Sequence, residues 1–164
     1  MALAVIRRSE VKLSDQVRAL AESLCAALPE DCATFFVQDD PSSTGGGTTF
    51  SFTPWAPEAA PIVINCIESE ITLIVEKDSR FEFLVRDDSE RQRALDDVQQ
   101  ICASVISGRF SEVHWYAGDE VVRVDGRVCV DDQVLKTSSR SLRRLFSRKQ
   151  KRAVHYTPYC EGQG

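Results

Sequence analysis

The 164-residue sequence lacks the short motifs that mark most nucleotide, metal and redox sites. Its glycine run, at residues 44–48, is not followed by the Lys and Ser/Thr of a phosphate-binding loop, and no GxGxxG pattern is present. The six cysteines form no CxxC pair, and of the two histidines only His155 lies near a cysteine, Cys160. We therefore predict a protein that is not an enzyme and holds no cofactor or metal. An enzyme assembled from distant Cys and His residues stays open as a further alternative.

The sequence also lacks a long apolar run. Nothing in it approaches the roughly 20 apolar residues that a membrane-spanning helix needs. Residues 1–6 are apolar and are followed by Arg7 and Arg8, whereas a secretory signal carries its charges first and a longer apolar segment after them. We therefore expect a cytoplasmic protein without a transmembrane segment, whose cysteines are buried reduced thiols.

Charge is plentiful and unevenly distributed along the chain. The apolar fraction of 43% and the net charge of −5 are ordinary for a globular protein, and the length predicts one domain. Residues 1–132 carry 24 acidic and 12 basic side chains, whereas residues 133–164 carry eight basic side chains and one acid, Glu161. We therefore expect an acidic α+β part at residues 1–135 and a basic helical segment with a tail at residues 136–164, both within one domain.

The order of the expected elements predicts an α+β fold with a mainly antiparallel sheet. Two amphipathic helices are expected to pack on one face of the sheet, and a third, basic helix to follow near the C-terminus. Ser14 is expected to cap the first helix, Ser89 to begin the second and Gly108 to end it. Turns are expected at residues 118–119 and 125–126. The expected helices are residues 14–28, 89–108 and about 139–151, and the expected strands are residues 33–37, 48–53, 62–67, 71–76, 81–85, 110–117, 120–124 and 127–130.

Candidate partner-binding residues on the sheet come from the expected strand at residues 110–117. If Val113 and Trp115 face the core, His114 and Tyr116 lie on the exposed face, because side chains alternate along a strand. Arg123 of the next strand is assigned to the same exposed face. A shift of one residue would reverse this assignment.

The basic segment at residues 136–152 supplies the other candidates. As a helix it would gather Leu142, Leu145 and Phe146 on one side and spread its cations over the rest. Such a helix could contact an acidic partner, phosphates or an anionic membrane surface, or it could dock on the acidic body of its own domain. Its candidate residues are Arg140, Arg143, Arg144, Arg148 and Lys151.

The separation of charge is the strongest functional feature of the sequence. With no catalytic motif beside it, it predicts a non-enzymatic accessory protein that binds another protein. The alternative is nucleic-acid or anionic-surface binding through residues 136–152, against which the acidic remainder argues because it repels phosphate. A homodimer is left open.

A resemblance covers residues 84–135, where a helix ending in ISGR precedes EVHWYAGDEVVRVDGRV. This stretch resembles small bacterial α+β proteins, among them immunity proteins of toxin systems. The order of elements and the acidic body are also similar to those of small acidic dimeric secretion chaperones, although this chain has more expected strands and a basic tail. Both resemblances imply a protein that binds another protein, and neither provides functional residues for this chain.

Overall fold

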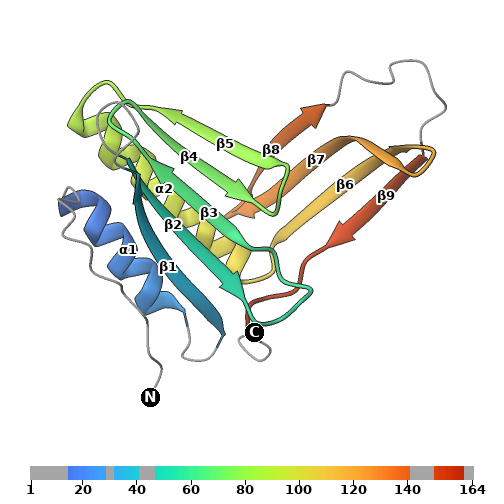
Figure 1. Ribbon diagram of the computed structural model, residues 1–164, viewed down its shortest axis with the longest axis horizontal. Helices are drawn as coiled ribbons and strands as arrows, with labels where there is room; N and C mark the ends of the chain where they lie inside the picture. Colours follow the sequence, from blue (N-terminus) through green and yellow to red (C-terminus); the bar gives the residue numbers. More distant parts are fainter. Residues whose placement is uncertain (1–14, 29–31, 41–46, 141–149, 161–164) are drawn as a thin grey trace.

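The computed structural model describes residues 15–28, 32–40, 47–140 and 150–160, which form two helices and nine strands (Figure 1). The strands make two antiparallel sheets, one in the order β1-β2-β3-β4-β5 and one in the order β8-β7-β6-β9. The α+β class and the antiparallel pairing expected from the sequence are therefore confirmed. The elements are α1 (Asp15–Ala27), β1 (Ala33–Asp40), β2 (Gly47–Pro54), β3 (Ile62–Cys66), β4 (Glu70–Val75), β5 (Ser79–Leu84), α2 (Asp88–Ile106), β6 (Phe110–Ala117), β7 (Glu120–Val130), β8 (Gln133–Arg140) and β9 (Gln150–His155).

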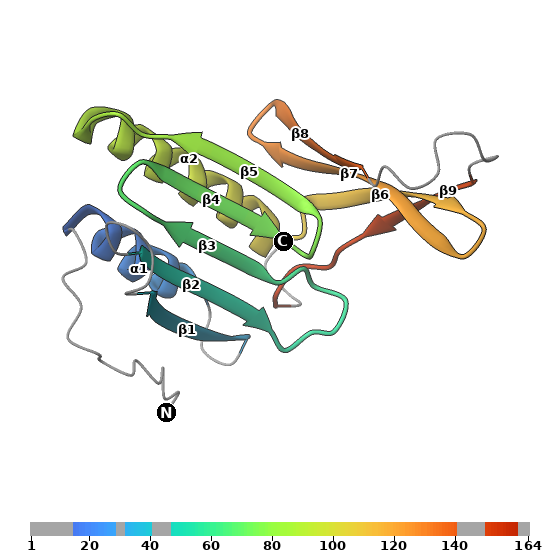
Figure 2. The same ribbon diagram turned by 45° about the horizontal axis from the view of Figure 1, so that its top comes forward.

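The five-stranded sheet is a meander in which each strand pairs with the next one in sequence. Both helices cover the same face of this sheet, as Figure 2 shows. The core therefore lies between the inward side chains of the strands, such as Phe50 and Ile64, and the apolar stripes of the helices, such as Leu20 and Val98. Burial of these alternating positions supplies the hydrophobic free energy that holds the two layers together.

The two helices begin and end close to the expected residues. Helix α1 confirms the first prediction, although the expected cap, Ser14, lies outside the described residues. Helix α2 begins earlier than expected, because the Oδ1 atom of Asp87 accepts a hydrogen bond from the backbone N–H of Glu90 at 2.8 Å. Gly108 follows its end with a φ of 77°, a left-handed conformation that suits glycine.

The four-stranded sheet differs from the sequence prediction at Asp125 and Gly126. These residues were expected to form a turn, but they lie within β7, which runs without interruption from Glu120 to Val130. A Cβ atom on Gly126 would lie 2.6 Å from the Oγ1 atom of Thr137 and closer still to the Oγ atom of Ser79. Glycine is therefore present here to allow close approach of neighbouring side chains, and the turn follows at Asp131, whose φ is 50°.

The prediction of a third helix at about residues 139–151 is wrong at both ends of this range. Ser139 and Arg140 belong to strand β8, and Gln150 and Lys151 belong to strand β9, while residues 141–149 lie outside the described residues. Strand β8 pairs with β7, and β9 pairs with β6. These pairings satisfy backbone groups along both edges of the β6–β7 hairpin, and this tertiary gain overrides the local helical pattern.

A disulfide bond joins Cys32 and Cys160, whose Cα atoms lie 5.7 Å apart. The expectation of six reduced thiols is therefore wrong for this pair. The cysteines are 128 residues apart in sequence, so no local spacing could indicate their contact. The other four are free: Cys66 and Cys102 are buried, Cys25 is partly buried and Cys129 is exposed.

No helix among the described residues is long and apolar enough to cross a membrane.

Candidate functional site

The outer face of the four-stranded sheet gathers basic side chains around one tryptophan. Burial alternates along β7, where Val124, Gly126 and Val128 point inward and the residues between them point outward. We call the outward set the basic face. It consists of Trp115, Arg123, Asp125, Arg127, Lys136 and Lys151, which come from all four strands.

Trp115 lies between two cations in adjacent strands. It pairs in register with Arg123 of β7 on one side and with Lys151 of β9 on the other. The Cζ atom of Arg123 lies 5.4 Å from the centroid of the indole ring, and the Nζ atom of Lys151 lies 5.9 Å from it. Both distances allow an electrostatic attraction between the cation and the ring. Three strands thus contribute to one cationic–aromatic row.

Asp125 fixes the orientation of this row. Its Oδ2 atom accepts a hydrogen bond from the indole Nε1 of Trp115 at 2.8 Å, and its Oδ1 atom accepts one from Nε of Arg123 at 2.6 Å. Partial burial alone would raise the pKa of Asp125, but hydrogen bonds from Arg123, Ser138 and Trp115, with the charge of Arg123, lower it below its ordinary value. The carboxylate therefore stays ionised at neutral pH and holds Trp115 and Arg123 in place.

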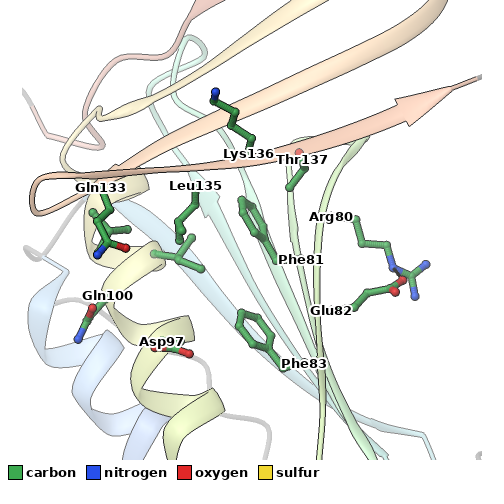
Figure 3. Close-up of a pocket in the computed structure, with 12 residues that line it drawn as sticks. Arg80, Phe81, Glu82, Phe83, Asp97, Gln100, Gln133, Leu135, Lys136 and Thr137 are labelled. Carbon is green, nitrogen blue, oxygen red and sulfur yellow. Dashed lines mark ion pairs between the residues drawn. The ribbon is translucent and has the colours of Figure 1, made fainter.

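A second pair of cations lies on the same face, two register positions beyond Asp125. Arg127 of β7 pairs with Lys136 of β8, and both side chains are exposed. Arg127 lies four positions further along β7 than Arg123, which is roughly 13 Å at the usual rise per residue. In Figure 3, Lys136 points away from the groove into which Leu135 projects. The face therefore presents four cations and one carboxylate.

The other face of β6 is occupied by a buried polar cluster. The carboxylate of Glu112, which is 1% exposed, accepts hydrogen bonds from Ser79 Oγ at 2.7 Å and from Tyr156 OH at 2.8 Å. Its Oε2 atom also lies 2.7 Å from Nε2 of His114. Ser79 belongs to the five-stranded sheet, and Glu112 and His114 belong to the four-stranded one, so the cluster joins the two sheets.

The geometry of the buried cluster fits a structural role and not that of a catalytic triad. Glu112 stands between Ser79 and His114 and contacts both, so the imidazole is not placed as a base for the serine hydroxyl. Ser79 is 0% exposed, which leaves its hydroxyl out of reach of a substrate. A carboxylate buried with three partners is costly to disrupt, and its role is to hold the sheets together.

The predicted site residues are divided between these two faces. His114 contacts the buried Glu112 and pairs with Val124, so it lies on the inward side of β6 and its expected place on one exposed face with Arg123 is wrong. Tyr116 is partly buried, and its ring centroid lies 6.4 Å from that of His114. Trp115 is only partly buried and belongs to the opposite face with Arg123 and Lys151. The reversal has a physical reason: the inward register places Phe110 in the core and gives Glu112 its three partners.

The remaining predicted site residues come from the basic segment. Arg140 pairs in register with Arg123, so its backbone extends the row that contains Trp115. Arg143, Arg144 and Arg148 lie outside the described residues. Trp115 and Arg127 were not predicted as site residues from the sequence. The alternation of Arg123, Asp125 and Arg127 indicates one face only if residues 120–130 form one strand, whereas two strands with a turn at residues 125–126 were expected.

A groove runs along the other side of β8 (Figure 3). It has a volume of about 530 Å³ and lies between β5, α2 and β8. Phe81, Phe83 and Leu135 form its apolar floor, and charged residues such as Glu82 and Asp97 lie along its rim. Arg80 also lines the groove, so charged side chains of both signs surround it.

No three His, Cys, Asp or Glu side chains in the described part of the chain lie close enough together to hold a metal ion. Comparison of the chain with protein-family models, curated proteins and solved structures finds no match. The resemblance to immunity proteins and secretion chaperones therefore stays a prediction from the sequence.

Proposed function

We propose that the protein is a non-enzymatic accessory protein that binds an acidic surface of another protein through its basic face. The observation that carries this proposal is the row in which Arg123 and Lys151 flank Trp115. Trp and Arg are the side chains most enriched at the energetic centres of protein interfaces. Beside the row, Arg127 and Lys136 extend the positive charge along the paired strands β7 and β8.

Charge complementarity indicates the chemistry of the partner. The chain carries a net charge of −5, yet this face carries four cations and one carboxylate. A positive patch on an acidic protein orients an incoming partner so that its acidic side meets the patch, and it repels basic partners. An acidic protein surface of limited size would contact the basic face without meeting the acidic remainder.

The same geometry favours a protein over a nucleic acid. Base stacking requires an aromatic ring with an accessible face, whereas a cation lies within 6 Å of the ring centroid of Trp115 from each neighbouring strand. A long polyanion would also extend over the acidic parts of the molecule.

A binding experiment with a defined acidic polymer tests the proposal. Fluorescein-labelled poly-L-glutamate, of a length that spans only the basic face, is titrated with the full chain at physiological salt, and anisotropy reports the dissociation constant. The double variant Lys136→Glu/Lys151→Glu reverses two exposed cations of the basic face. The matched control Lys77→Glu/Arg86→Glu makes the same change of charge at two exposed positions elsewhere. We expect the first variant to bind at least about tenfold more weakly, and the control to change binding less than about threefold.

Two outcomes would overturn this assignment. Equal weakening by both double variants would show that net charge, and not the basic face, controls association. The other outcome is that the chain binds a single-stranded oligonucleotide of matched charge more tightly than poly-L-glutamate and that the Lys136→Glu/Lys151→Glu variant loses this binding. That result would replace the protein partner with a nucleic acid.

A further inference from the structure

The Cys32–Cys160 disulfide connects the C-terminal end of the four-stranded sheet to the start of the five-stranded one. Cys32 directly precedes β1, and Cys160 follows β9 by five residues. We call residues 156–160 the C-terminal clamp. Because β9 leads directly into this clamp, the disulfide anchors the segment that holds β9 in place.

Hydrogen bonds attach the clamp to β6, to the connection between β2 and β3, and to the last residue of α2, Ile106. The N–H of Tyr156 donates to the carbonyl of Phe110 at 3.3 Å, and the N–H of Thr157 donates to that of Glu58 at 3.0 Å. Tyr159 is 3% exposed, and its hydroxyl donates to the carbonyl of Ala60 at 2.7 Å. These contacts position the end of β9, and the disulfide keeps them together.

Strand β9 depends on the clamp because it has few other attachments. It is an edge strand that pairs with β6, and four of its residues in succession, at positions 150–153, are exposed. Edge strands with little buried side-chain area open locally at low free-energy cost. Lys151, which lies at the Trp115 ring, is in this exposed part.

We infer that Cys32 and Cys160 form a thiol–disulfide switch that controls the basic face by securing or releasing β9. This inference rests on the proposed function, since it concerns regulation of the same surface. With the disulfide intact, the clamp holds β9 against β6 and keeps Lys151 beside Trp115. With the disulfide reduced, β9 separates from β6 more often, and the face loses one of its cations.

The chemistry requires an external thiol such as glutathione. A glutathione thiolate attacks one sulfur of the disulfide, forms a mixed disulfide and releases the other cysteine as a thiol. A second glutathione thiolate then attacks the glutathione sulfur of this mixed disulfide, which releases the remaining cysteine as a thiol and forms glutathione disulfide. Overall, the disulfide and two glutathione thiols give two cysteine thiols and glutathione disulfide, with two electrons and two protons transferred to the protein. Cys32 and Cys160 both line an open cavity of about 530 Å³ beside Trp55, so a small thiol can reach them.

The other cysteines differ from this pair in ways that make the switch measurable. Burial raises the pKa of Cys66 to about 12 and also raises that of Cys102, so neither thiol is reactive at neutral pH. Cys129 is exposed and serves as the control. Alkylation of the folded chain followed by mass determination should therefore add two more labels after reduction than before it.

Hydrogen exchange and poly-L-glutamate binding together test the inference. The oxidised full chain, the same chain treated with glutathione, and the variant Cys32→Ser/Cys160→Ser are compared, with Cys129→Ser as the matched control. We expect amides of residues 151–155 to exchange at least about fivefold faster in the reduced chain and in the double variant, while those of β3 stay unchanged. Poly-L-glutamate affinity should fall about threefold or more in both, and Cys129→Ser should behave as the parent chain.

The readouts separate failure of the switch from failure of the proposed function. Unchanged exchange at residues 151–155 after verified loss of the disulfide would overturn the switch, whatever the polymer binds to. Faster exchange with unchanged poly-L-glutamate affinity would also overturn the switch, because release of β9 would then leave binding by the basic face unchanged. If exchange responds but no form of the chain binds poly-L-glutamate, the proposed function fails and the structural coupling stands.

Discussion

At the scale of single residues, two positions in the four-stranded sheet decide how it meets the rest of the molecule. Glu112 is a buried carboxylate that is stabilised by a serine, a tyrosine and a histidine from three segments. Gly126 lies beside it in register and leaves room for Ser79 to reach that carboxylate. Glu112 thus occupies a core position because Gly126, opposite it, allows Ser79 to approach.

The residue Gly126 gives a direct test of this packing. We expect Gly126→Ala to lower the free energy of unfolding by about 1–3 kcal/mol, because the added methyl group would overlap the side chains of Ser79 and Thr137. Chemical denaturation monitored by circular dichroism measures the loss. Arg127→Ala, at the exposed neighbouring position, is the control and should change stability by less than about 0.5 kcal/mol. Similar midpoints for the two variants would contradict the crowding at Gly126.

At the scale of elements, α2 shows how a boundary is set by one side chain. The sequence predicts that the helix begins at Ser89, but the N-cap in the structure is Asp87, whose carboxylate accepts from the N–H of Glu90. Glu90 in turn accepts from the backbone N–H of Arg86 at 2.9 Å. Reciprocal bonds of this kind satisfy donors that the first turn of a helix leaves free.

Because Asp87 is the N-cap, substitutions at Asp87 and Ser89 should lower the free energy of unfolding by different amounts. Asp87→Ala should destabilise the fold by about 1 kcal/mol, because it removes the acceptor at the start of α2. Ser89→Ala should cost less than about 0.5 kcal/mol, since residue 89 lies inside the helix. Thermal unfolding of both variants is the measurement, and a larger loss for Ser89→Ala would show that the helix begins at the residue expected from the sequence.

Strands β8 and β9 show the opposite relation between sequence and element. Their sequences are basic and contain many helix-compatible residues, yet each lies against an edge of the β6–β7 hairpin. The gain comes from cross-strand pairing, which no window of local sequence contains. The basic face exists because these two strands place their cations beside those of β7.

At the scale of the whole molecule, buried ionisable groups predict a loss of stability in alkali. Burial, with the adjacent carboxylate of Glu112, raises the pKa of Tyr156, and burial raises that of Tyr159. Burial also raises the pKa of Cys66 and Cys102. Each group stays neutral in the folded chain at a pH where the unfolded chain would release its proton.

The sign of the effect follows from proton linkage. A group with a raised folded-state pKa contributes stability that is complete below its unfolded pKa and is lost as pH rises above it. We therefore expect stability to decline from about pH 9, where unfolded thiols ionise, and more steeply above about pH 10, where tyrosines do. Urea midpoints across this range measure the decline, and Tyr156→Phe should make it shallower. A flat profile to pH 11 would contradict the burial of these groups.

The sequence alone determined those elements whose periodicity is complete within one segment. Apolar residues at helical spacing placed α1 and most of α2, and alternation with turn residues placed β1 to β5 close to their bounds. The mainly antiparallel pairing followed from the order of the expected helices and strands. In each case the spacing of apolar residues within the segment is enough to predict which stripe or face is buried.

Only the tertiary structure decided which face of β6 is buried, that residues 133–140 and 150–155 are strands, and that Cys32 meets Cys160. Each of these depends on a partner far away in the chain. Trp115 was expected in the core, but the three partners of Glu112 place the opposite side of β6 inward. The basic residues were expected in a helix, but they pair with the edges of β6 and β7. Local sequence sets the periodicity of a segment, but the free energy of pairing and burial between distant segments selects its face and its neighbours.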